Sequence, residues 1–355
     1  MRKQESENYY DGLPVGRLGM IPMENCSPLG KKVDDYLVSW RKERAHQNES
    51  ILQDYMRDSF IIPSKVPRFG SGEAKGLINE SVRGDDIYLL TDVTNYSMTY
   101  KLFGRETNMS PDDHFQDLKR IIAAIGGKAR RINVIMPFLY ESRQHRRSGR
   151  ESLDCALALQ ELVNMGVDNI ITFDAHDPRV QNSIPLHGFE TVQSAYQFIK
   201  NILRNAPDMQ IDSNHLMVIS PDEGGTKRAI YMDKDMIIID DMISSGDSMI
   251  EVATLLKKHG ARNIYLCSTF GLFTNGLLKF DQAYEQGLFT KLLTTNLVYQ
   301  SPELLEKPWY VSCDMSKYTA LIIDTLNHDS SISGLLDPAE RIQKVLGKFR
   351  NHEKI

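Results

Sequence analysis

Short apolar runs recur along the chain, and most of them are separated by longer segments with apolar residues at helical spacing. The runs that predict strands are 18–22, 86–91, 132–136, 169–173, 216–219, 237–239, 263–268 and 291–295. The segments that predict helices are 29–44, 110–125, 151–165, 191–203, 249–256, 315–326 and 338–349. Because strands that alternate with helices of this length are typical of parallel sheets, the pattern predicts an α/β fold.

The clearest element boundary is the start of a helix at residues 110–113, which read Ser-Pro-Asp-Asp. Ser110 is a favourable N-cap, and Pro111 suits the first helical position because its missing N–H would be unpaired there. Two acidic residues then lie at the positive end of the helix dipole. The pair Gly126-Gly127 predicts the helix end.

The alternation of strands and helices occurs twice, on either side of a loop around Pro185 and Gly188, without a direct sequence repeat. We therefore expect two Rossmann-like domains, each a mainly parallel sheet flanked by helices. A length of 355 residues also suggests about two domains. The expected parts are a flexible tail at 1–15, an N-terminal α/β domain at 16–188, a C-terminal α/β domain at 189–335 and a C-terminal helix or tail at 336–355.

Composition is that of an ordinary globular protein, with 41% hydrophobic and 25% charged residues and a net charge of −5. An acidic balance gives no overall attraction to nucleic acid or to an anionic membrane, so anionic substrates need local basic clusters. The four cysteines form no Cys-x-x-Cys pair, and we expect them to be buried in a reducing compartment. No apolar run approaches bilayer length, and the first residues are polar, so a cytoplasmic protein is expected.

Residues 236–259 are the most informative stretch of the chain. The run Ile237, Ile238 and Ile239 indicates a strand covered on both faces, and Asp240 and Asp241 are expected to end it. A turn of small and hydroxyl-bearing residues then leads into a helix. The turn consists of Ser244, Ser245, Gly246, Asp247 and Ser248.

Such a strand–turn–helix unit brings backbone N–H groups and a helix N-terminus to the carboxyl edge of a sheet, where a phosphate is favoured. The paired aspartates suit the vicinal hydroxyls of a pentose or a hydrated metal ion. The alternative interpretation is a capped helix after a buried strand, in which Asp and Ser serve only turn chemistry.

Polar clusters also follow three other predicted strands. Residues 143–150 contain four arginines, whose forked guanidinium groups can bind phosphate oxygens. A solvated basic face or a nucleic-acid patch is the alternative, but the acidic total favours a nucleotide phosphate. His176 lies between Asp174 and Asp177 and could coordinate a metal, although Mg²⁺ prefers oxygen ligands. Asp222 precedes a Gly-Gly turn that can expose amides to an anion.

The stretch from Asp240 to Ser248 resembles the phosphoribosyl-diphosphate-binding fingerprint that phosphoribosyltransferases share with ribose-phosphate diphosphokinases. From about Leu18 to Leu336 the chain resembles the diphosphokinases. The further landmarks are Gly72-Glu73 with residues 78–84, Arg143-Gln144-x-Arg146, Asp174-Ala175-His176, Ser220-Pro221-Asp222-x-Gly224-Gly225 and residues 327–336. The resemblance implies two domains of the phosphoribosyltransferase type. It also implies transfer of a diphosphoryl group from MgATP to the 1-hydroxyl of ribose 5-phosphate, with release of AMP.

The same resemblance implies roles for individual residues. Arg143, Gln144 and Arg146 would contact ATP, and Phe69 and Glu73 would hold the adenine across a subunit boundary. His176 and Asp222 would bind or orient the Mg²⁺ of ATP. Asp240 and Asp241 would hold ribose hydroxyls, and Ser244, Ser245, Gly246, Asp247 and Ser248 would hold the 5-phosphate. Arg143, His176, Asp240 and Asp241 form the expected catalytic set. The family also implies an active site between the domains and a homo-oligomer of dimers, expected to be a hexamer.

One departure from the family pattern concerns its long basic loop, which carries a Lys-Arg-Arg element before the ribose-phosphate strand. Here Asp240 follows Asp222 by only 18 positions. Either the numbering closes over residues that belong to the protein, or the loop is deleted. We expect the first, because the flanking motifs keep the family's residues.

A true deletion would favour a non-catalytic regulatory homologue of the synthetase. A phosphoribosyltransferase is the other alternative, but it would give Arg143-Gln144 and residues 174–176 no purpose. Smaller departures are His145 and Ser244, each of which stands where the family has an acid.

Overall fold

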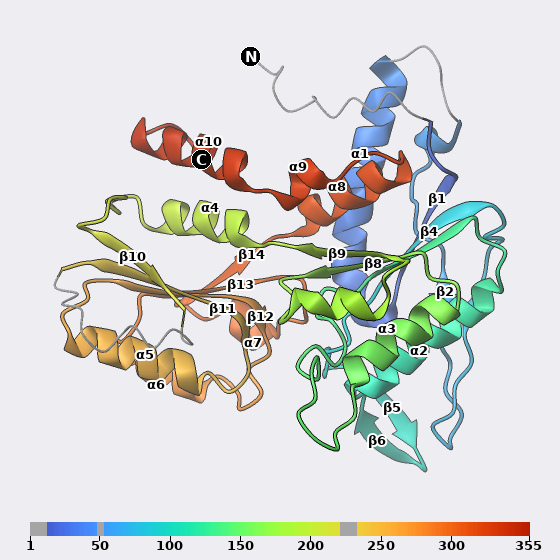
Figure 1. Ribbon diagram of the computed structural model, residues 1–355, viewed down its shortest axis with the longest axis horizontal. Helices are drawn as coiled ribbons and strands as arrows, with labels where there is room; N and C mark the ends of the chain where they lie inside the picture. Colours follow the sequence, from blue (N-terminus) through green and yellow to red (C-terminus); the bar gives the residue numbers. More distant parts are fainter. Residues whose placement is uncertain (1–12, 48–52, 221–232) are drawn as a thin grey trace. The chain divides into compact units, whose positions relative to one another are not determined.

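The computed structural model describes residues 13–47, 53–220 and 233–355, and these residues form two compact units (Figure 1). The first unit contains the described residues up to Thr172, together with Asp177–Val192 and Ser316–Leu336. The second unit contains Phe173–His176, Gln193–Met315 and Asp337–Ile355. Each unit has one five-stranded sheet, which confirms the predicted α/β fold with two mainly parallel sheets.

The sheet of the first unit has the strand order β1-β4-β7-β8-β9, and β1, β4, β7 and β8 pair in parallel. Its strands are β1 (Arg17–Pro22), β4 (Asp85–Leu90), β7 (Arg131–Ile135), β8 (Asn169–Phe173) and β9 (Gly188–Val192). Its helices are α1 (Ser27–Gln47), α2 (Pro111–Ile125), α3 (Asp154–Asn164), α8 (Ser316–Asn327) and α9 (Ser333–Leu336). Three short 3-10 helices are Glu24–Cys26, Gln53–Met56 and Pro178–Ser183. Two antiparallel hairpins complete the unit, β2 (Ser64–Lys65) with β3 (Leu77–Ile78), and β5 (Thr99–Leu102) with β6 (Arg105–Asn108).

The sheet of the second unit is parallel throughout and has the strand order β10-β11-β12-β13-β14. Its strands are β10 (Leu216–Ile219), β11 (Asp235–Ile243), β12 (Ile264–Gly271), β13 (Lys291–Thr295) and β14 (Tyr310–Cys313). Its helices are α4 (Ala195–Asn205), α5 (Asp247–Lys258), α6 (Leu278–Glu285), α7 (Pro302–Leu305) and α10 (Ala339–Arg350). Ile238 packs in the same cluster as residues of α5 and α6, and Ile237 packs in the same cluster as residues of α4 and α10. Both faces of β11 are therefore covered, as its apolar run predicts.

The predicted start of α2 is present in full. The Ser110 hydroxyl accepts a hydrogen bond from the backbone N–H of Asp113, and the Asp113 carboxylate accepts one from the N–H of Ser110. Gly126 ends the helix at φ 61°, in the left-handed region that glycine adopts without a steric penalty.

Several predicted elements differ from the observed ones. Asp240 and Asp241 lie inside β11, because this strand continues its pairing with β12 as far as Ile243. Thr191 and Val192 belong to β9, and the predicted helix begins at Ala195 instead. The strands and helices that the apolar pattern did not indicate are β2, β3, β5, β6, β9, α6, α7, α9 and β14.

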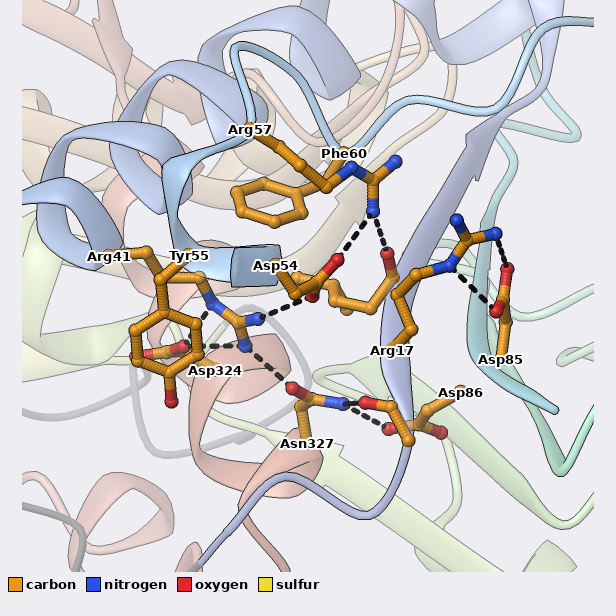
Figure 2. Close-up of polar contacts among 12 residues, drawn as sticks. Arg17, Arg41, Asp54, Tyr55, Arg57, Phe60, Asp85, Asp86, Asp324 and Asn327 are labelled. Atoms are coloured by element: carbon orange, nitrogen blue, oxygen red, sulfur yellow. Dashed lines mark hydrogen bonds and ion pairs between the residues drawn. The ribbon is translucent and has the colours of Figure 1, made fainter. Parts of the chain in front are cut away.

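Helix α8 belongs to the first unit, although a single cut near residue 188 would place it in the second. It packs along α1, and buried polar contacts join the two helices (Figure 2). Arg41 has a side chain that is 0% exposed, and its Nε and Nη2 donate to Asp324 Oδ1 at 3.1 and 3.0 Å. Arg41 Nη2 also donates to Asn327 Oδ1 at 2.6 Å, and Arg44 Nη2 donates to the second Asp324 oxygen at 2.7 Å.

The same cluster reaches the sheet through Asn327. Its Nδ2 donates to Asp86 Oδ2 at 2.9 Å (Figure 2). Asp86 also accepts two hydrogen bonds from the Arg131 guanidinium. Buried charges are costly unless they are paired and hydrogen-bonded, and here Asp324 and Asp86 are each paired with at least one guanidinium. These contacts link residues more than 240 positions apart and account for the return of α8 to the first unit.

The four cysteines, Cys26, Cys155, Cys267 and Cys313, are free and buried, as expected. Within the described residues, no helix combines the length and the hydropathy that a membrane span requires.

Candidate active site

The turn between β11 and α5 has the geometry expected of an anion site. Gly246 adopts φ 82° directly before α5, and a Cβ added there would lie 2.2 Å from Cζ of Phe280. Glycine is therefore required at this position for both conformation and space. The Ser245 hydroxyl donates to Asp247 Oδ2 at 2.6 Å, and the first N–H groups of α5 point toward the turn. Helices of this length carry a partial positive charge at that end.

Asp241 contacts His176, although the sequence assigned these two residues to different ligands. Its Oδ2 accepts a hydrogen bond from His176 Nδ1 at 2.7 Å, and its Oδ1 accepts one from the backbone N–H of Met242 at 2.8 Å. Asp240 Oδ1 accepts a hydrogen bond from the N–H of Asp241 at 2.9 Å. The structure thus brings the predicted metal residue His176 to the predicted ribose-binding pair, at the carboxyl half of β11.

The turn that carries His176 is held by Asp174, which the sequence suggested only as part of a motif. Asp174 has φ 35°, which is uncommon for a residue other than glycine. Its Oδ2 accepts a hydrogen bond from the Thr269 hydroxyl at 2.6 Å and one from the Ser194 N–H at 3.1 Å. Burial raises the pKa of the Asp174 carboxyl, and these hydrogen bonds oppose that shift.

Thr269 and Ser194 were therefore missed as residues that support the site. Thr269 lies toward the end of β12, where a polar residue follows an apolar run, and that signal was present in the sequence. Ser194 directly precedes α4, so its position depended on the boundary that was misplaced.

The residues predicted to hold adenine lie on a tight turn of the first unit, between β2 and β3. The N–H of Phe69 donates to the carbonyl of Glu73 at 2.7 Å, and Arg68 Nη1 donates to the carbonyl of Gly72 at 3.2 Å. Arg68 is itself fixed by Asp117, at 2.8 Å. The Phe69 ring is 54% exposed, so it is available to a flat ligand.

The basic loop after β7 keeps its arginines at the surface. Arg143, Arg146, Arg147 and Arg150 are exposed, and Gln144 Nε2 donates to the carbonyl of Ser152 at 2.9 Å. His145 Nε2 lies 3.5 Å from Asp177 Oδ2. The Arg179 guanidinium holds the pKa of the Asp177 carboxyl well below its usual range. Four exposed guanidinium groups on one loop can bind several phosphate oxygens.

The sequence predicts His176 and Asp222 as the residues that hold a metal ion. Asp222 lies outside the described residues, as do Gly224 and Gly225. Within the described part of the chain, no group of three or more His, Cys, Asp or Glu side chains is arranged to hold a metal ion. His176 and Asp241 meet as a pair, which is fewer ligands than a dedicated Mg²⁺ cage needs.

The connection between β10 and β11 is short. The 355-residue sequence runs without a break from Asp222 to Asp240, so the expectation that the numbering closes over further residues is wrong. The two strands are neighbours in the sheet, with Leu216 opposite Asp235.

Comparisons with known proteins agree on one group of relatives. Residues 18–166 match the family model described as the N-terminal domain of ribose phosphate pyrophosphokinase, and residues 189–307 match the phosphoribosyl transferase domain. A ribose-phosphate pyrophosphokinase of Shewanella oneidensis is 25% identical over 307 residues, which cover 76% of this chain and 89% of the relative. One of Maricaulis maris is 23% identical over 319 residues, with coverage of 81% and 95%.

A solved structure has the same fold. The phosphoribosylpyrophosphate synthetase of Mycobacterium smegmatis matches with a TM-score of 0.69 at 18% identity, over 88% of this chain and 100% of the other. The observed architecture is thus shared along nearly the whole length of both chains.

Proposed function

This chain belongs to the ribose-phosphate pyrophosphokinase family, and we propose that it transfers the diphosphoryl group of MgATP to the 1-hydroxyl of ribose 5-phosphate. The products are 5-phosphoribosyl 1-diphosphate and AMP. The observation that carries the proposal is the arrangement of His176, Asp241 and the Gly246 turn. It places groups that can bind hydroxyls and groups that can bind a phosphate at the end of one strand. The two family models together match more than half of the chain and support the same reaction.

In the second unit, the ribose 5-phosphate site is proposed at the end of β11. Asp240 and Asp241 accept hydrogen bonds from the ribose hydroxyls, since ionised carboxylates are strong acceptors. The N–H groups at the start of α5 and the hydroxyls of Ser244, Ser245 and Ser248 donate to the 5-phosphate.

In the first unit, the nucleotide site is proposed on the exposed turn and the basic loop. The Phe69 ring stacks on adenine and Glu73 accepts from its amino group. Arg143 and Arg146 bind phosphate oxygens, and Gln144 donates a further hydrogen bond. By family analogy, Phe69 and Glu73 serve the site of a neighbouring subunit in a homo-oligomer built from dimers.

The chemistry needs no side-chain nucleophile, because transfer of a phosphoryl-type group is mainly positioning and charge neutralisation. The carboxylates orient the 1-hydroxyl, and the arginines stabilise the charge that develops on the transferring group. Since the described residues offer a pair of ligands and no cage, we propose that His176 and Asp222 would hold the Mg²⁺ of MgATP. When bound, it neutralises part of the phosphate charge.

One observation favours a second candidate function, which is a non-catalytic homologue that binds nucleotides and assembles with an active partner. Only 18 positions separate Asp222 from Asp240, which leaves no room for the family's basic loop with its transfer-stabilising lysine and arginine. Lys227 and Lys234 lie in this connection, but neither is assigned the missing role.

The deciding experiment is an AMP-release assay with Mg²⁺, ATP and ribose 5-phosphate. If the protein is a synthetase, AMP release should depend on ribose 5-phosphate. It should be lost in the variant Asp240→Asn/Asp241→Asn. ATP binding without AMP release, measured by calorimetry on the same protein, would instead support the non-catalytic candidate. AMP release that does not require ribose 5-phosphate would contradict both.

A further inference from the structure

The phosphate turn contains an acid at a position that opposes its proposed ligand. Asp247 is the first residue of α5, and its carboxylate lies where the helix N-terminus attracts a negative charge. The 5-phosphate of the substrate is proposed to occupy the same region. A phosphate and a carboxylate this close would repel each other unless a cation lies between them.

The structure supplies such a cation from another element. Lys279, in the first turn of α6, forms an ion pair with Asp247 through its Nζ and the Asp247 Oδ1. Hydrogen bonds from Lys279 and Ser245 lower the pKa of the Asp247 carboxyl. The side chains of Lys279 and Asp247 are 42% and 52% exposed, so a ligand can reach both.

The start of α6 is held against the phosphate turn by its own contacts. Phe280, the neighbour of Lys279, packs over Gly246 so closely that a Cβ would lie 2.2 Å from the ring. Before α6, the N–H of Thr274 donates to the carbonyl of Ser244 at 3.0 Å. The ammonium group of Lys279 is therefore carried by backbone that is fixed next to residues 244–248.

We propose that Lys279 is a ligand of the phosphate group of ribose 5-phosphate, with Asp247 as the counter-ion that holds it in place. This inference rests on the proposed function. An ammonium group has three N–H donors, so it can bond the carboxylate and a phosphate oxygen together. Lys279 would make the site selective for a phosphorylated pentose over the free sugar.

The competing explanation is that Lys279 only neutralises Asp247. The variants Lys279→Met, Asp247→Asn and the double variant separate the two, with ribose 5-phosphate binding measured by calorimetry without ATP. As a ligand, Lys279 is expected to contribute about tenfold or more in affinity, the size of a charge-assisted hydrogen bond. Lys279→Met and the double variant should both bind ribose 5-phosphate more weakly, because both lack the ammonium group, and Asp247→Asn alone should weaken binding less than Lys279→Met, because the ammonium group remains. Recovery of normal binding in the double variant would overturn the proposal.

Two control variants test whether the effect on binding is specific to the charge of Lys279. Lys279→Arg should keep most of the affinity, because a cation remains. Lys344→Met removes a comparable exposed pair, with Glu340, on α10, and it should leave binding unchanged. Thermal melting checks that each variant is folded. If the unchanged protein binds no ribose 5-phosphate, the proposed function fails together with this inference. If it binds and Lys279→Met binds equally well, only this inference fails.

Discussion

Asp241 is the residue where the proposed metal and ribose roles meet, because one of its oxygens accepts from His176. The variant Asp241→Asn should raise the KM for ribose 5-phosphate by about tenfold or more, since an amide is a weaker acceptor for a hydroxyl. The thermal midpoint should change little, because the side chain is only partly buried. Steady-state AMP release and melting curves measure the two effects, with Asp212→Asn, an exposed acid paired with His215, as the control. Unchanged ribose 5-phosphate kinetics would remove Asp241 from the site.

Thr269 supports the site indirectly, because its hydroxyl donates a hydrogen bond to Asp174. Thr269→Val keeps the shape but removes the hydroxyl that donates to the buried carboxylate, and should cost about 1–3 kcal/mol in unfolding free energy. It should also shift the imidazole NMR signals of His176, because Asp174 fixes the turn that carries this residue. Thr269→Ser retains the donor and should restore the signals. A destabilised variant with unchanged His176 signals would show that Thr269 acts on stability alone.

The site residues that follow one another in the chain could be predicted from the sequence. Those that reach the site from distant positions could not. Asp240, Asp241 and the turn 244–248 are readable because strand, turn and helix are local. Lys279 reaches Asp247 from a position 32 residues later, and Thr269 reaches Asp174 from 95 residues away. Such pairs arise from tertiary packing, which no local pattern encodes.

At the level of elements, the contact between α1 and α8 depends on one buried carboxylate. Asp324→Ala would remove the carboxylate that accepts two hydrogen bonds from the buried Arg41 and one from Arg44, and breaking a buried pair in this way costs about 3–5 kcal/mol. Urea unfolding measures the loss. Asp58→Ala, which removes an exposed partner of Lys42 near α1, should leave stability unchanged. Equal stability of the two variants would contradict a structural role for the cluster.

His328, which directly follows α8, is buried and should make stability depend on pH. Burial lowers the pKa of His328, although Asp324 opposes the shift, so the folded protein binds fewer protons than the unfolded chain below about pH 6.5. Its contribution to the unfolding free energy is therefore complete above that pH and is lost as the pH falls. Urea midpoints at pH 7.5 and 5.5 should differ less in His328→Gln than in the unchanged protein. His352→Gln, at an exposed position, serves as the control, and an unaltered pH dependence in His328→Gln would contradict the prediction.

Elements were predictable where local chemistry and burial agree. Helix α2 has its cap, its proline and its glycine end in sequence, and β8, β10 and β13 have apolar runs with the observed limits. The hairpin of β5 and β6 alternates exposed and partly buried positions and has no apolar face to reveal it. Strand β11 was predicted too short because Asp240 and Asp241 interrupt its apolar run, and the pairing with β12 continues the strand past them to Ile243.

On the scale of the whole molecule, the chain does not divide at one point. Two segments of the first unit follow residues of the second, and the buried cluster around Arg41 and Asp324 joins the later of these segments to α1. Periodicity along the chain shows where elements alternate, but it carries no information on which unit a returning helix joins. Folding of the first unit should therefore require residues 316–336, and a fragment that ends near residue 188 would lack them.

The proposed assembly can be tested by mixing two variants of the chain in one oligomer. If Phe69 and Glu73 serve the nucleotide site of a neighbouring subunit, Glu73→Ala and Asp241→Asn damage different parts of a shared site. Each variant alone should release little AMP. In dimers formed at random from equal amounts of both, half are mixed and each mixed dimer has one intact site, so about one quarter of the unchanged activity should return. Native mass spectrometry would verify mixed oligomers of the 40.5 kDa chain. Mixed oligomers without recovered AMP release would show that each chain uses its own Glu73.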